Sequence, residues 1–214
     1  MSASRPPRFA TWLLQHLASS PQPESLAGDL IEQYRHGHSA AWYWRQVLAA
    51  ILAGVTRDIR AHKLLALRAV AIGWFLYILF SFPVIWLTGA IGVWMREWLA
   101  ATGRYTFWGV WLSSHLPGAL FVYVACAISG WIVARLHQTH VVAMVSLYGA
   151  SVALFEYGMA GWMFARHGLP SVPEPQAVLV LPLVLTVGRP VSILLGGLWA
   201  LRSDGNTTLP VSPR

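Results

Sequence analysis

Two ionisable residues stand well inside the long apolar stretches of this chain, Glu156 and Arg189. A charged side chain within a bilayer costs several kcal/mol unless it is paired or hydrated, so such residues mark candidate functional sites. A carboxylate and a guanidinium can neutralise each other, bind a polar ligand or an ion, or stand apart with each side chain reaching toward water. The residue types alone leave all three arrangements open.

Helix geometry favours pairing of these two residues. They lie on stretches that we expect to be antiparallel neighbours joined by a loop of about a dozen residues. At 1.5 Å per residue, Glu156 lies roughly 12 Å and Arg189 roughly 18 Å from the outer ends of their helices. A long arginine side chain covers an offset of about 6 Å. We therefore expect a charge pair that either fixes the register of two helices or forms a ligand or ion site.

The sequence around Arg189 predicts an interruption of its helix. Gly188 and Pro190 flank the arginine, and Pro182 lies shortly before them. Proline removes a backbone hydrogen bond and clashes with the preceding turn of a helix. We expect a helix break at Pro182, Gly188 and Pro190 near mid-membrane. Broken membrane helices expose backbone groups that hold substrates in transporters, although kinks also occur in helices that bind nothing.

The other reactive residue types form no recognisable catalytic or metal site. Two pairs of nearby histidines have metal-like spacing but lack a third ligand close by. Cys126 is the single cysteine, which rules out an internal disulfide and a multi-cysteine metal site. The only lysine, Lys63, follows no glycine-rich loop, so the chain has no phosphate-binding P-loop. We expect no metal, no cofactor and no enzyme activity.

Four apolar stretches define the architecture that positions these residues. Each is close to the roughly 20 residues that a helix needs to cross a bilayer. The chain is 56% hydrophobic and 11% charged, whereas soluble proteins contain roughly 25% charged residues. We expect an all-α polytopic membrane protein with a helical head at residues 1–68, a transmembrane domain at residues 69–201 and a disordered tail at residues 202–214. The predicted spans cover residues 69–95, 116–134, 141–164 and 177–201.

The distribution of positive charge predicts the orientation. With four spans, only three of the 15 Lys and Arg residues fall in the loops opposite the termini, namely Arg96, Arg104 and Arg166. Cytoplasmic loops carry an excess of Lys and Arg, and this bias sets membrane topology. We therefore expect a multi-pass protein of the bacterial inner membrane, with its N- and C-termini in the cytoplasm.

The head contains three amphipathic helical patterns, and the third ends in a basic cluster. It begins near Ser39, a suitable N-cap, and its uncharged centre at residues 46–56 is too short to cross a bilayer. Its apolar face lies either in the cytoplasmic leaflet or against the first two helices as a small core. In the leaflet, anionic lipid phosphates would contact its basic residues, Arg57, Arg60, Lys63 and Arg68. We expect the net charge of +7 to favour contact with anionic lipid, and we expect no nucleic-acid partner.

Two segments of the head carry a family resemblance: GDLIEQY at residues 28–34 and WYWRQVL at residues 42–48. They resemble the permease prefix domain of bacterial FtsX-like (MacB-type) ABC permeases and of small stand-alone membrane proteins with the same prefix. The matching residues include Asp29, Glu32, Trp42, Trp44 and Arg45. The resemblance implies a helical head and a membrane setting. The spans show no likeness to the permease core, and the large extracytoplasmic domain of those permeases is missing.

Asp29 and Glu32 lie three residues apart on one helical face. Paired carboxylates can act as acid and base, but on a short exposed helix they are usually solvated or salt-bridged. We expect them to help position the head on its own membrane helices or on a partner.

These features favour a non-enzymatic accessory or regulatory membrane protein that associates with itself or with a permease. The alternative is a small transporter or channel subunit that uses the intramembrane site at Glu156 and Arg189.

Overall fold

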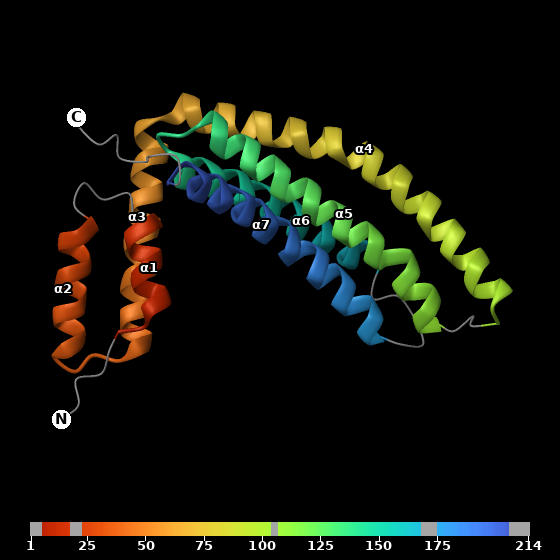
Figure 1. Ribbon diagram of the computed structural model, residues 1–214, viewed down its shortest axis with the longest axis horizontal. Coiled ribbons are helices and arrows are strands. Elements are labelled where there is room, and N and C mark those ends of the chain that lie inside the picture. The colour runs from red at the N-terminus through yellow and green to blue at the C-terminus, as the bar shows by residue number, and fades with distance from the viewer. Residues whose placement is uncertain (1–5, 18–22, 104–106, 168–174, 206–214) are drawn as a thin grey trace, which may run out of the picture. The chain divides into compact units, whose positions relative to one another are not determined.

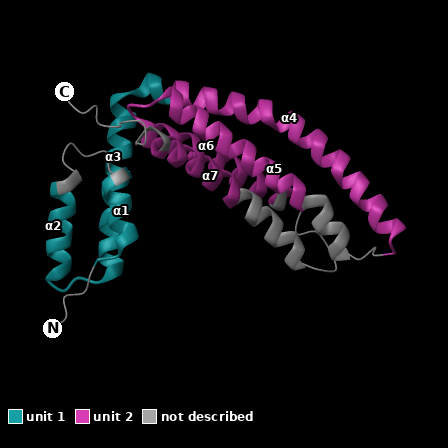
Figure 2. Cartoon of the chain, in the orientation of Figure 1, with its two compact units in different colours: residues 1–66 teal, residues 67–214 magenta. Residues whose placement is uncertain are grey.

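A computed structural model describes residues 6–17, 23–103, 107–167 and 175–205 of the chain, and every regular element in these ranges is an α-helix (Figure 1). The prediction of an all-α chain is confirmed over this part. The helices are α1 (Arg8–Leu17), α2 (Pro23–Arg35), α3 (Ala40–Ala61), α4 (Lys63–Ala101), α5 (Phe107–Leu136), α6 (Val141–His167) and α7 (Pro175–Gly205). The chain divides into two compact units, residues 1–66 and residues 67–214 (Figure 2).

Helices α1, α2 and α3 form the small core of the first unit. The side chain of Ser39 caps α3 by accepting a hydrogen bond from the Trp42 amide at 3.2 Å. Gly37 has a positive φ of 104°, which a glycine adopts readily, and follows the end of α2. The buried core residues are Ala10, Leu14, Ala27, Leu30, Tyr34, Tyr43 and Val47.

Helix α3 contributes to this core through its first turns only. Tyr43 and Val47 are fully buried, and the Tyr43 hydroxyl lies 3.0 Å from the Thr11 hydroxyl of α1. Leu48 and Leu52, by contrast, are 50% and 65% exposed. Of the two arrangements expected for the apolar face, packing in a core therefore holds for the first turns of α3. Contact of its later turns with lipid stays a prediction.

Within the described residues, three helices are long and apolar enough to cross a membrane, at Lys63–Ala101, Leu116–Leu136 and Val141–Trp162. Helix α7 covers the fourth predicted span, residues 177–201, but the side chains of residues 175–186 lie outside the described residues. The fourth span therefore stays a prediction. Helix α7 also continues to Gly205, so the first residues of the expected tail are helical, whereas residues 206–214 lie outside the described part.

Helices α5, α6 and α7 pack together, and α4 lies at the periphery of this group (Figure 1). Only 6% of the residues in the most apolar part of α4 are buried within the chain, against 33% in α5 and 39% in α6. The 39 residues of α4 extend well beyond the predicted span. At 1.5 Å per residue the helix is about 58 Å long, which exceeds the hydrocarbon core of a bilayer.

Glycines set the closest approach between α5 and α7. A Cβ atom at Gly130 would collide with the backbone carbonyl of Ile193, and one at Gly196 would collide with the carbonyl of Ala127. Such small residues let membrane helices touch backbone to backbone. A Cβ atom at Gly158 or Gly161 of α6, by contrast, would meet no atom of the described residues within 4 Å.

The predicted break in the fourth apolar stretch is wrong. Helix α7 is continuous from Pro175 to Gly205 and passes through Pro182, Gly188 and Pro190 without interruption. In membrane proteins, neighbouring helices and small local adjustments satisfy the backbone groups that a proline frees. Gly188 and Pro190 are partly buried, and a Cβ atom at Gly188 would meet the Tyr123 ring of α5.

Candidate functional site

The structure brings Glu156 and Arg189 together. Arg189 of α7 donates from Nη1 to Oε1 of Glu156 on α6, and the two residues form an ion pair. Their side chains are 20% and 17% exposed. The pair therefore lies largely within the protein, where neither charge could stay alone at low cost.

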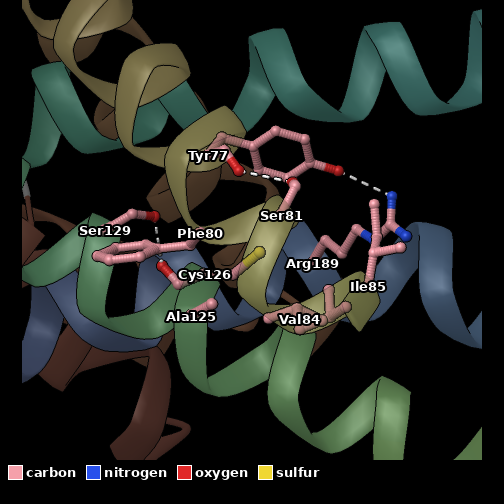
Figure 3. Close-up of a pocket in the computed structure, with 10 residues that line it drawn as sticks. Tyr77, Phe80, Ser81, Val84, Ile85, Ala125, Cys126, Ser129 and Arg189 are labelled. Atoms are coloured by element: carbon pink, nitrogen blue, oxygen red, sulfur yellow. Dashed lines mark hydrogen bonds between the residues drawn. The ribbon is translucent and has the colours of Figure 1, made fainter. Parts of the chain in front are cut away.

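Tyr77 of α4 completes this group, and sequence reasoning missed it. Its hydroxyl donates to Glu156 Oε1 at 2.6 Å and accepts from Arg189 Nη1 at 2.8 Å. Figure 3 shows the tyrosine hydroxyl turned toward the guanidinium. We call Tyr77, Glu156 and Arg189 the polar cluster. It links three helices through one carboxylate oxygen and one guanidinium nitrogen.

A second set of polar contacts ties α4 and α5 to α6 beside the polar cluster. The Trp74 indole N–H donates to the Ser151 hydroxyl at 3.1 Å, and the Trp74 ring stands edge-on to Phe155 with centroids 5.0 Å apart. The Tyr148 and Ser129 hydroxyls lie 3.0 Å apart between α6 and α5. Because side-chain hydrogen bonds between membrane helices supplement apolar packing, the Trp74 contacts help to hold the peripheral α4 in place, and the Tyr148–Ser129 contact joins α5 to α6.

A cavity of about 240 Å³ adjoins the polar cluster (Figure 3). Helices α4, α5 and α7 form its walls, and most of the lining is apolar. It is partly open to the surface of the unit. The lining residues are Tyr77, Phe80, Ser81, Val84 and Ile85 of α4, Val122, Ala125, Cys126 and Ser129 of α5, and Arg189 of α7.

Two serine hydroxyls of the cavity wall form hydrogen bonds, whereas one nitrogen of Arg189 forms none with the described residues. Ser81 donates to the Tyr77 carbonyl at 2.6 Å, and Ser129 donates to the Cys126 carbonyl at 2.8 Å. Arg189 Nε, by contrast, is buried and has no hydrogen-bond partner among the described residues. A buried donor without an acceptor is costly, which makes this nitrogen the unsatisfied point of the site.

The head residues suggested by the sequence lie on α2 and α3 of the first unit. Asp29 and Glu32 are exposed on α2, and Arg45 is exposed on α3. Trp42 and Trp44 are partly buried and pack against the head core. This arrangement uses the two tryptophan rings for packing.

The basic cluster at the end of the head is exposed at every position: Arg57, Arg60, Lys63 and Arg68. In the part of the chain that the structure describes, no group of three or more His, Cys, Asp or Glu residues is placed to hold a metal ion.

Comparison with protein-family models, with curated proteins and with solved structures finds no match to this chain. The resemblance of the head to a permease prefix therefore stays a prediction.

Proposed function

We propose that this chain is a non-enzymatic accessory or regulatory protein of the bacterial inner membrane that acts by binding another membrane protein, with a permease as the expected partner. The polar cluster carries this proposal. Glu156, Arg189 and Tyr77 form hydrogen bonds and an ion pair with one another and join three helices. An ion pair that is engaged in this way suits a structural role, because separating the charges within a bilayer is costly.

The partner surface that we propose is the outward face of α6. Gly158 and Gly161 are exposed and have open space around them, and Ala165 on the same helix is exposed as well. Small residues at such positions allow a second membrane helix to approach closely. The same proposal includes four spans, both termini in the cytoplasm, and a prefix-like head that contacts anionic lipid through its basic residues.

Site-specific photocrosslinking in intact bacterial membranes tests this proposal. A benzophenone amino acid replaces Gly161 in one variant and Met159 in the other. Met159 is also exposed on α6, but it lies on a different side of the helix. We expect the probe at position 161 to form a protein adduct of defined mass, identified by mass spectrometry as a permease or a second copy, and the probe at 159 to react with lipid. Equal protein crosslinking at both positions, or none, would contradict the proposal.

A small transporter or channel subunit is the second candidate function. The cavity beside Arg189 favours it, since a binding space in contact with intramembrane polar groups is a feature of transport sites. The continuous α7 removes the broken helix that first suggested it.

A further inference from the structure

Arg189 is the only charged residue among the described residues that line the cavity beside the polar cluster. Each hydroxyl group at its wall already donates: Tyr77 to Glu156, Ser81 to the Tyr77 carbonyl, and Ser129 to the Cys126 carbonyl. Arg189 uses Nη1 for its two acceptors and keeps a buried Nε without a partner among the described residues. Because a guanidinium is a donor only, a molecule that satisfies it must supply an acceptor.

The charge of the site favours a neutral acceptor. Glu156 neutralises Arg189 within the cluster, so an anion entering the cavity finds no unpaired cation. It would also lose its hydration against a mostly apolar wall. A carbonyl oxygen avoids this desolvation and still accepts a hydrogen bond from the charged guanidinium, which is a stronger bond than one between neutral groups.

The size and position of the cavity define the rest of the ligand. At about 30 Å³ per water molecule, the cavity of about 240 Å³ has room for a single substituted ring, and it is smaller than the roughly 300–1,000 Å³ of common drug-sized sites. Phe80, Val84 and Ile85 supply apolar wall from α4, and Val122 supplies it from α5. The partly open side lets an apolar tail continue outward along the helices.

We propose that the cavity between α4, α5 and α7 binds an uncharged, lipid-soluble carbonyl compound of single-ring size, of which a quinone head group is the best fit. The carbonyl oxygen accepts from the guanidinium of Arg189, and the ring fills the apolar part of the cavity. This inference goes beyond the proposed partner binding on α6 and does not depend on it.

Three probes of nearly the same shape test the proposal: duroquinone, durene, which lacks the carbonyl groups, and tetramethylbenzoate, which carries a negative charge. Cys126 reports occupancy because it lines the cavity and is the only cysteine of the chain. The full chain in detergent micelles is treated with N-ethylmaleimide at rising probe concentrations, and alkylation is read by mass spectrometry. The shift of the thermal unfolding midpoint gives a second measurement that needs no thiol reaction.

We expect duroquinone to bind with a dissociation constant about tenfold lower than that of durene, the size of effect expected for one hydrogen bond to a charged group. It should also bind more tightly than tetramethylbenzoate, whose charge would lose its hydration in the cavity. Ala125→Phe should abolish the effect by filling the cavity. Leu120→Phe is the matched control, since Leu120 is on the same helix, is 56% exposed and does not line the cavity.

Equal binding of durene would overturn the proposal by showing that apolar volume alone decides. Tighter binding of the benzoate would overturn it in favour of an anion site. Unchanged duroquinone binding in Ala125→Phe would place the ligand elsewhere, and saturable binding of no probe in either measurement would show that the cavity takes no ligand of this class.

Discussion

A partly buried charge pair and one hydroxyl group form the polar cluster of the second unit. Glu156 Oε1 accepts from both Arg189 and Tyr77, and Arg189 Nη1 donates to both partners. With side chains only 20% and 17% exposed, the two charged residues depend on each other more than on water. Removing one of them leaves a charge that has lost its partner.

A double-mutant cycle measures this dependence. Glu156→Gln and Arg189→Gln should each destabilise the protein by about 2–3 kcal/mol, because each leaves one charge unpaired in a partly buried site. The double variant should recover at least about 1 kcal/mol of the summed loss, since no orphan charge remains. Thermal unfolding in micelles gives the comparison, with Glu97→Gln, an exposed carboxylate of α4, as the control. Strictly additive losses would show that the pair contributes no coupling.

The tyrosine hydroxyl has its own test. Tyr77→Phe should lower the free energy of unfolding by about 1–2 kcal/mol, because it removes a donor to a carboxylate and an acceptor for a guanidinium while keeping the ring. Tyr157→Phe is the matched control, since Tyr157 is 51% exposed on α6. If the two phenylalanine variants unfold alike, the Tyr77 hydroxyl does not hold α4 to the cluster.

The charges of this site could be predicted from the sequence, whereas the tyrosine could not. Glu156 and Arg189 are conspicuous because few ionisable residues occur in the apolar stretches, and the depth argument placed them within reach of each other. Tyr77 is one of seven tyrosines, and its role depends on how α4 is rotated about its axis. A buried tyrosine hydroxyl usually has a hydrogen-bond partner. The position of Tyr77 in a predicted span therefore indicated that it has a partner, but did not indicate which residue that partner is.

At the scale of the elements, packing overrides local sequence preference. Gly188 and Pro190 predict a broken helix, yet α7 runs through both positions. Here α7 packs against α5 and α6, and its Gly196 lies directly on the Ala127 carbonyl group of α5. Gly130, Gly196 and Gly197 lie at contacts between helices, whereas the surroundings of Gly158 and Gly161 are open. Spacing alone does not distinguish the inward face of a helix from the outward one.

This difference between glycines predicts opposite effects of one substitution. Gly130→Ala and Gly196→Ala should each cost about 1–3 kcal/mol of stability, because the added methyl group would push against backbone that cannot move aside easily. Gly158→Ala has open space around it and should be neutral or slightly stabilising, since alanine favours helix more than glycine does. Unfolding in micelles compares the three. Equal losses at all three positions would contradict the close approach of α5 and α7.

At the scale of the whole molecule, the first unit combines its own helical core with an exposed basic end. Polybasic segments near anionic lipid gain about 1 kcal/mol of binding free energy per basic residue close to the surface.

A polarity-sensitive dye at Ala53, attached through Ala53→Cys in a Cys126→Ser background, should shift its emission to shorter wavelength in nanodiscs of anionic lipid. The shift should diminish with added salt and in the combined variant Arg57→Gln, Arg60→Gln, Lys63→Gln. A dye at the exposed Gln33 of α2 is the control. Identical emission in anionic and zwitterionic nanodiscs would leave the basic cluster without a lipid role.

The number of spans is the other property of the whole chain that the charge pattern predicts. Within the described residues, three helices have the length and composition to cross a membrane. A fourth crossing, by α7, would return the C-terminus to the side of the head. Cysteines introduced one at a time in a Cys126→Ser background are labelled with an impermeant maleimide. With four spans, Ser39→Cys and Gln138→Cys should react only in inverted membrane vesicles, and Arg104→Cys and Arg166→Cys only in intact spheroplasts.

The labelling of Arg214→Cys distinguishes a chain with four spans from a chain with three. This cysteine should label together with Ser39→Cys, because an even number of crossings places both ends on the side that the excess of Lys and Arg keeps in the cytoplasm. Labelling of Arg214→Cys from the opposite side would show an odd number of spans and would remove the cytoplasmic assignment of the tail.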